Sequence, residues 1–319
     1  MKDVTLQINL SPGDDAYAEQ TVPALVAAHA GATERLLVVD LCKPQATRIV
    51  DPAQRYPEPA YSARQARILS LAEAWGRSGL VDRVVALRPG DELFGTLSRR
   101  YLRPWLRETH DYGGCALMAY LAAFELCRTR WLLHFDADVL IYQKPGFDWT
   151  GAAQEALARD PTIVAATPRP APPMLAGIDA PTAHERLRSL DRPAGWLNAW
   201  CSTRCYLFDL ERLRPLLPLL QGRIYWETLL ARLRGRGYPR SPEIMIFRRM
   251  QAARCWRLVL RDKDSWLLHP ARKDPLFHRL LPAMLDSVRQ GLCPETQRGH
   301  ADLDLDAWAA WLDEPAPRR

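Results

Sequence analysis

The sequence predicts an α/β fold with a mostly parallel central sheet and helices on its faces. Short runs of apolar and β-branched residues, typical of buried strands, alternate with longer segments whose apolar residues recur at helical spacing. The alternation continues over roughly the first 140 residues, and repeated strand–helix–strand units build parallel sheets covered by helices. With 319 residues, 48% of them hydrophobic, the chain is long enough to bury a large core.

The N-terminal part shows this alternation most clearly. The predicted elements are strands at 4–10, 35–41, 82–87 and 130–135, and helices at 15–30, 62–79 and 113–127. The last of these helices opens with Gly113 and Gly114, and an irregular proline-rich stretch runs to Pro59. Ligands of open α/β sheets bind at the carboxyl ends of the strands, which is where Asp40 and Asp136 lie.

The pattern is looser after residue 145. The predicted elements are helices at 150–159, 225–237 and 241–253, and strands at 162–168, 203–210, 256–260 and 265–270. Ser241 as N-cap and Pro242 as the first helical residue support the start of the last helix. The proline-rich segment 168–181 predicts a loop that could cover a site.

Composition excludes several classes of protein. The net charge of +6 arises from dispersed basic residues among 37 acidic ones, with no basic stripe interleaved with aromatic residues, so we expect no nucleic-acid partner. No apolar run reaches the ~18 residues of a membrane span, and the start lacks the order of a signal peptide. We therefore expect a cytoplasmic protein with at most peripheral membrane contact. Seven cysteines without paired spacing predict reduced thiols.

Two carboxylates, Asp136 and Asp138, follow the apolar strand 130–135 directly. Other pairs of aspartates at this spacing occur in the chain, but only these two end a strongly apolar strand that follows an apolar helix. Residues i and i+2 of a strand point the same way, so both carboxylates can approach one divalent cation that bridges a diphosphate. The alternative is an acidic turn with no ligand.

The stretch GGCALMAYLAAFELCRTRWLLHFDADVLIY, residues 113–142, resembles the GT-A class of glycosyltransferases, especially its large bacterial family-two-like group. In that group, a helix of small and apolar residues runs into a strand that ends in a metal-binding Asp-x-Asp. The resemblance extends over roughly residues 4–295. It implies a nucleotide-sugar donor bound across the ends of the first strands, with Mn²⁺ or Mg²⁺ held by Asp136 and Asp138.

The resemblance also implies which residues contact the donor. They are Leu10, Ser11 and Pro12 against the nucleoside, Asp40 hydrogen-bonded to the base, Gly113 and Gly114 where a helix start approaches the donor closely, and Asp136 at the diphosphate. By the same comparison, residues 1–145 form the nucleotide-sugar-binding half of a GT-A domain and 146–295 its acceptor-binding half. Residues 296–319 form a C-terminal helix and tail.

The general base of the family lies near the start of a late helix, and two glutamates fit that place. Glu243 stands thirteen residues before a strand that leads to His269, although Ile244 replaces the second acid and Cys255 the glycine of the family pattern. Glu227 begins the preceding helix, and another acid such as Asp191 is a further alternative. Either glutamate could instead stabilise a helix N-terminus. His269 is a candidate third metal ligand or a hydrogen-bonded turn residue.

Two further pairs are open to two interpretations. Trp196 and Trp200 have the i, i+4 spacing of a helix face, and could stack against an acceptor sugar or belong to the core. Arg272 and Lys273 could neutralise donor phosphates or simply be exposed to solvent.

The predicted function is metal-dependent transfer of a sugar, with the inversion that the resemblance implies, onto a hydroxyl of a glycan, a lipid-linked glycan, a protein or a small molecule. A sugar-nucleotide nucleotidyltransferase is an alternative, but the loop NLSPGDDAYAEQ is acidic and lacks that class's glycine-rich basic sequence. A non-catalytic α/β protein that binds a nucleotide or sugar is the other alternative, kept open by Ile244.

Overall fold

The computed structural model describes residues 2–176, 179–182, 190–235 and 239–313. Its main sheet consists of β1 (Val4–Leu10), β2 (Glu34–Asp40), β3 (Arg83–Leu87), β4 (Trp131–Asp136), β6 (Ile163–Thr167), β7 (Leu190–Arg192), β8 (Gly195–Asn198), β9 (Cys205–Asp209) and β10 (Trp256–Leu260). The order across the sheet is β3-β2-β1-β4-β9-β6-β10-β8-β7. Of these strands, only β9 and β8 run against the others. The predicted fold class is confirmed.

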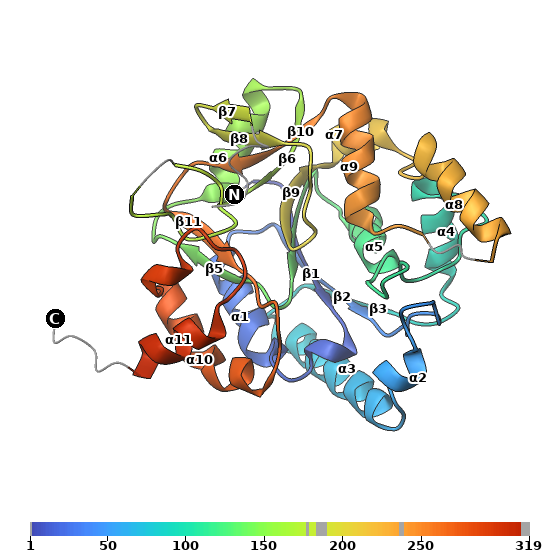
Figure 1. Ribbon diagram of the computed structural model, residues 1–319, viewed down its shortest axis with the longest axis horizontal. Coiled ribbons are helices and arrows are strands. Elements are labelled where there is room, and N and C mark those ends of the chain that lie inside the picture. The colour runs from blue at the N-terminus through green and yellow to red at the C-terminus, as the bar shows by residue number, and fades with distance from the viewer. Residues whose placement is uncertain (1, 177–178, 183–189, 236–238, 314–319) are drawn as a thin grey trace.

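Helices cover both faces of the sheet. They are α1 (Ala18–Ala28), α2 (Pro52–Arg55), α3 (Ala60–Ser78), α4 (Glu92–Tyr101), α5 (Met118–Leu126), α6 (Trp149–Arg159), α7 (Leu210–Leu213), α8 (Arg223–Leu233), α9 (Pro242–Ala253), α10 (Pro275–Arg289) and α11 (Leu305–Asp313). One apolar core lies between the sheet and α1, α3, α6, α10 and α11, and the other beneath α4, α5, α8 and α9 (Figure 1). No described helix is both long and apolar enough to cross a bilayer.

The order of the strands places a crevice beside β1. After β1 the chain adds β2 and then β3 on one side, and it returns to place β4 on the other side of β1. In parallel α/β sheets the connections diverge at such a reversal, and ligands bind there, outside the carboxyl ends of the strands. Leu10, Asp40 and Asp136 are the last residues of β1, β2 and β4.

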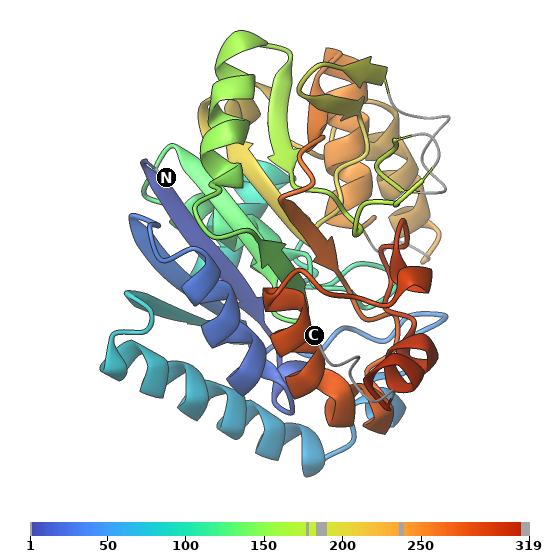
Figure 2. The same ribbon diagram turned by 90° about the vertical axis from the view of Figure 1, so that its left-hand side faces the viewer.

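A separate two-stranded sheet brings the C-terminal part of the chain to this crevice. β5 (Leu140–Gln143) pairs antiparallel with β11 (Ser265–Leu268), and Leu268 lies opposite Leu140. This register places His269, just after β11, next to Asp138, just before β5. Helix α10 then packs against β5 and α1, as Figures 1 and 2 both show.

The sequence-based boundaries were wrong at two helices. The helix predicted to start at Gly113 begins at Met118, because Asp111 caps a turn through the backbone N–H groups of Gly113 and Cys115. The helix predicted over 15–30 begins at Ala18, after a 3₁₀ turn over Pro12–Asp14. Helices α2, α4, α7 and α10 and strands β5, β7 and β8 were not predicted. Residues 314–319, the end of the predicted C-terminal helix and tail, lie outside the described residues.

A glycine on β8 gives a test of this arrangement. Gly195 has a φ of 152°, and a Cβ on it would collide with the backbone carbonyl oxygen of Val259 on β10. Gly90 has a φ of 84°, and a Cβ on it would meet nothing within 4 Å. Alanine at position 90 therefore measures only the cost of a side chain at positive φ, without a collision. We expect Gly90→Ala to lower the free energy of unfolding in urea by about 1 kcal/mol. Gly195→Ala should cost about 1–3 kcal/mol more, because the two strands must separate. Equal losses would contradict the close β8–β10 pairing.

Candidate functional site

Two adjoining pockets lie at the carboxyl ends of the strands. The Asp136 pocket, of about 180 Å³, is lined by Asn9, Leu10, Ser11, Asp14, Asp40, Ala116, Ala119, Tyr120, Asp136, Ala137, Asp138 and Lys273. The Arg257 pocket, of about 290 Å³, is lined by Val139, Thr167, Pro170, Thr182, Trp200, Ser202, Arg204, Cys205, Glu243, Arg257, Leu267, Leu268, His269 and Ala301. Asp138 and His269, one from each pocket, contact one another and form the wall between them.

Asp136 is held in place from two sides. The Tyr120 hydroxyl on α5 donates to Asp136 Oδ1 over 2.7 Å, and His134 Nε2 lies 3.2 Å from the same oxygen. His134 is fully buried and contacts Gln7 through its other nitrogen. Burial and the charge of Asp136 raise the pKa of Tyr120 well above its usual range, so the hydroxyl remains a donor. The Asp136 carboxylate is therefore pre-oriented at the end of β4.

Asp138 is a buried carboxylate, 4% exposed, with two basic partners. Its Oδ2 lies 2.5 Å from Lys273 Nζ and 3.3 Å from His269 Nε2. Burial alone would raise the pKa of Asp138, but His269 and Lys273 together hold it well below its usual range. Its Oδ1 is buried and has no hydrogen-bond partner among the residues that the structure describes. One oxygen is thus neutralised internally and the other is left for a ligand.

Lys273 connects Asp138 to the loop after β1. Its ammonium also donates to the Tyr17 hydroxyl over 2.9 Å and lies 4.0 Å from Asp14 Oδ1. Tyr17 donates to Asp14 in turn, and Asp14 Oδ2 accepts from the Ser11 N–H over 2.6 Å. Burial raises the pKa of Asp14, and the Lys273 charge opposes that rise. Sequence patterns gave no sign of Asp14 or Tyr17, because their role depends on a lysine far along the chain.

Asp40 is the second buried acid of the Asp136 pocket. Its Oδ1 accepts from the backbone N–H of Cys42 over 2.9 Å, while its buried Oδ2 has no hydrogen bond within the described structure. Burial raises the pKa of Asp40 to about 6. The nearest basic group is His110, 3.9 Å away, and its own burial lowers its pKa to about 4. Asp40 therefore presents one oxygen without a partner to whatever enters the pocket.

Some of the residues predicted to contact the nucleotide-sugar donor do not line the Asp136 pocket. Leu10 and Ser11 line the Asp136 pocket as expected, whereas Pro12 is buried beside it. Gly113 and Gly114 belong to the turn before α5, and a side chain on Gly114 would contact Val50. From this part of the chain, the residues that line the Asp136 pocket are two alanines, Ala116 and Ala119, and Tyr120.

The two glutamates proposed as general base are in different environments. Glu243, in the first turn of α9, lines the Arg257 pocket and accepts from the backbone N–H of Thr203 over 2.7 Å. Glu227 lines neither pocket, and its carboxylate, 43% exposed, pairs with Arg223 one turn earlier on α8. The further alternative, Asp191, pairs with Arg261. Of these three acids, only Glu243 lines one of the two pockets.

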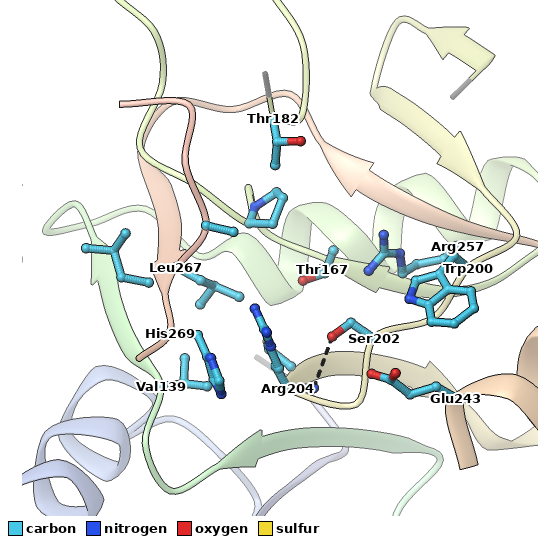
Figure 3. Close-up of a pocket in the computed structure, with 14 residues that line it drawn as sticks. Val139, Thr167, Thr182, Trp200, Ser202, Arg204, Glu243, Arg257, Leu267 and His269 are labelled. Carbon is cyan, nitrogen blue, oxygen red and sulfur yellow. Dashed lines mark hydrogen bonds between the residues drawn. The ribbon is translucent and has the colours of Figure 1, made fainter. Parts of the chain in front are cut away.

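The Arg257 pocket has a distinct polar wall and an aromatic residue at its edge. In Figure 3, His269 and Glu243 lie at opposite ends of the pocket, with Arg204 and Ser202 between them. Trp200, 37% exposed, packs on Phe247 of α9 with ring centroids 5.4 Å apart. Trp196 is not on a helix face with it, because it lies within β8, buried between Arg169 and Arg261.

The carboxylates at the end of β4 are suited in part to bind a divalent cation. Among the described residues, no group of three or more His, Cys, Asp or Glu side chains is placed to hold a metal. His269, predicted as a third ligand, lies beside Asp138, with its Nε2 3.3 Å from Asp138 Oδ2. Asp136 and Asp138 remain two oxygen donors at one strand end, and the Asp138 oxygen without a partner fits a hard cation such as Mn²⁺ or Mg²⁺.

Comparison with known proteins places few limits on the function. No protein-family model matches the sequence, and no curated protein matches it either. Among solved structures, the crystal structure of GalNAc-T7 with UDP, GalNAc and Mn²⁺ is similar, with 12% sequence identity and a TM-score of 0.48. The match covers 84% of this chain and 44% of that one, so the chain spans less than half the length of GalNAc-T7.

The raised pKa of Asp40 predicts a pH-dependent stability. An acid that ionises near pH 4 in the unfolded chain and at about 6 in the folded protein costs stability as the pH rises between these values. Asp40→Asn removes this cost and keeps an oxygen for the Cys42 N–H. Relative to this variant, the native protein should lose on the order of 2–3 kcal/mol of unfolding free energy between pH 4 and pH 7.

Urea denaturation across this pH range measures the difference. Asp286→Asn, at an exposed position on α10, is the matched control and should follow the native protein. If the native protein and Asp40→Asn differ in unfolding free energy by the same amount at every pH, Asp40 ionises at its ordinary pKa.

Proposed function

We propose that this chain is a glycosyltransferase of the GT-A type that transfers a sugar from a nucleoside-diphosphate donor to an acceptor hydroxyl. The observation that carries the proposal is the set of carboxylates around one pocket at the β1/β4 reversal, the buried Asp40 and Asp138 and the partly exposed Asp136. Two of them have a buried oxygen without a partner. Carboxylates in such a place require a donor of hydrogen bonds or a cation to offset their burial.

The Asp136 pocket is assigned to the donor. Asp40, at the end of β2, would accept a hydrogen bond from an N–H of the base, and Leu10 and Ser11 would lie against the nucleoside. Asp136 and Asp138 would hold Mn²⁺ or Mg²⁺, which when bound neutralises negative charge on the departing diphosphate. Lys273 adds a protein cation beside the same place, 2.5 Å from Asp138.

The reaction we propose is direct displacement at the anomeric carbon. Glu243 takes the proton of the acceptor hydroxyl, whose oxygen bonds to the anomeric carbon as the bond to the diphosphate oxygen breaks. The Glu243 carboxylate is oriented for this by the Thr203 N–H at its Oε1. Attack opposite to the leaving group inverts the configuration of the sugar. Residues 1–145 then act mainly on the donor and 146–295 mainly on the acceptor.

Binding of nucleotides tests the donor site. Calorimetric titration with nucleoside diphosphates and nucleotide sugars should show one preferred nucleotide, bound more tightly with Mn²⁺ or Mg²⁺ present. Asp138→Ala should weaken this binding at least tenfold, because it removes an oxygen donor from the pocket. Asp264→Ala is the control, since Asp264 also ends an Asp-x-Asp sequence but pairs with Lys144 on the surface. Absence of nucleotide binding by the folded native protein would rule out the proposal.

Replacement of each glutamate tests the base. Glu243→Gln should lower the rate of nucleoside-diphosphate release in the presence of acceptor by about 10²–10⁴-fold, with unchanged affinity for the donor. Glu227→Gln should remain close to the native rate, because Glu227 lines neither pocket. The assignment would be reversed by the opposite result, a large loss in Glu227→Gln and none in Glu243→Gln.

A further inference from the structure

The Arg257 pocket contains a buried cation that no part of the described protein neutralises. Arg257 is the second residue of β10, between Ala165 of β6 and Asn198 of β8, and it is 3% exposed. In Figure 3 its guanidinium points into the pocket, toward Thr167, with Trp200 beside it. The side chain therefore projects from the sheet into the Arg257 pocket and not into bulk solvent.

Arg257 has no partner within the structure described here. Its side chain makes no hydrogen bond, ion pair or cation–π contact with any described residue, and its buried Nε is without an acceptor. A guanidinium carries five N–H donors and remains charged at every physiological pH. A buried charge without a counter-ion costs several kcal/mol in general, so such a residue indicates a ligand that is absent.

Arg169 shows how the same fold satisfies a buried arginine that is structural. It is 1% exposed, yet its guanidinium donates to Asp179 and to the backbone carbonyls of Ala180, Arg261 and Asp262. It also lies over the ring of Trp196. Compared with Arg169, Arg257 lacks the acid, the carbonyl groups and the ring. Its environment is that of a residue that binds an anionic ligand.

The other charged groups of the pocket have partners of their own. Glu243 accepts from Thr203 through its backbone N–H and hydroxyl, and Arg204 pairs with Asp302 over 2.8 Å. Among the described residues, Glu243 is the only carboxylate that lines the pocket, and no ion pair joins it to Arg257. Arg257 is therefore the one basic side chain, of those described in the pocket, that has no acid within ion-pair distance.

The remaining walls suit a sugar ring. Trp200 packs on Phe247, which lies one helical turn after Glu243, so the indole and the carboxylate border the same face of α9. An aromatic ring offers an apolar face to a ring that also makes hydrogen bonds at its edge. A ligand could thus lie on Trp200 with one end at Arg257 and a hydroxyl at Glu243.

We propose that the Arg257 pocket binds an acidic saccharide, whose carboxylate, phosphate or sulfate oxygens are held by the guanidinium of Arg257. Arginine suits this role because its planar N–H pairs match two oxygens of such groups at once. The identification of this saccharide as the acceptor rests on the proposed function. The anion site itself does not, because it follows from Arg257 and its surroundings alone.

Three monosaccharides of similar size test the proposal. Glucuronate, glucose 6-phosphate and glucose are titrated into the full chain by calorimetry at constant ionic strength. We expect at least tenfold tighter binding of one or both charged sugars than of glucose. Preference for glucuronate or for glucose 6-phosphate identifies the acidic group as carboxylate or phosphate. Equal binding of all three, or no binding of either charged sugar, would overturn the proposal.

Variants of Arg257 assign the site. Arg257→Met should weaken binding of the charged sugar at least tenfold and leave any binding of glucose unchanged, whereas Arg257→Lys should retain part of the affinity. Undiminished binding of the charged sugar by Arg257→Met would contradict the assignment. A titration of the same samples with nucleoside diphosphate separates the two claims. Failure of nucleotide binding alone would remove the glycosyltransferase function and leave the anion site standing.

Stability without ligand gives an independent test. Because Arg257 makes no internal polar contact, Arg257→Met should unfold at a urea midpoint no lower than that of the native protein. Arg169→Met, which leaves Asp179 and several carbonyl groups without a donor, should lower the midpoint clearly. If the urea midpoint falls as much in Arg257→Met as in Arg169→Met, Arg257 is a structural residue, and its role as a binding residue is refuted.

Discussion

The interaction on which the site depends is that of the buried Asp138 carboxylate with Lys273 and His269. Burial raises the pKa of this carboxyl, which is 4% exposed, and the two basic groups hold it well below its usual range. Both partners come from the C-terminal part of the chain, brought there by the pairing of β11 with β5. The pairing of two short strands therefore places both basic groups beside Asp138, at the Asp136 pocket. Lys273 also contacts Tyr17, so the same ammonium ties the loop after β1 to the end of β4.

Buried charges fall into two groups in this protein. Those that support the fold are fully paired, as in Arg130 with Asp209 and Arg169 with Asp179. Those at the pockets are incompletely satisfied: Asp40 and Asp138 each have one oxygen without a partner, and Arg257 has none of its donors engaged within the described structure. Because unpaired buried groups lower stability, their concentration at one edge of the sheet is the physical mark of a site for ligands. Their signs also differ between the pockets, acids in one and a cation in the other.

The sequence was sufficient for elements whose pattern is local. The strands over 4–10 and 35–41, and the strand ending at Asp136, were predicted because continuous apolar runs signal buried parallel strands. The position of Asp40 and Asp136 at one sheet edge followed from that. The Lys273 contacts were not predictable, because they depend on the register of β11 with β5, and β5 was not predicted. Arg257 was missed for a related reason. Within the strand WRLVL it looks like an ordinary outward-facing residue, and only the order of the strands shows that both of its neighbours cover it.

The wall between the pockets gives them a shared electrostatic path. Asp138 contacts His269, whose other ring nitrogen faces Asp302 at 3.9 Å, and Asp302 pairs with Arg204 in the second pocket. A diphosphate in the first pocket would compete with Asp138 for Lys273, and Asp138 would then depend more strongly on His269. Charge placed in either pocket would in this way act on the side chains that border the other, through the contacts of Asp138, His269, Asp302 and Arg204. Coulombic effects of this kind are largest for groups that are mostly shielded from water, as Asp138 is.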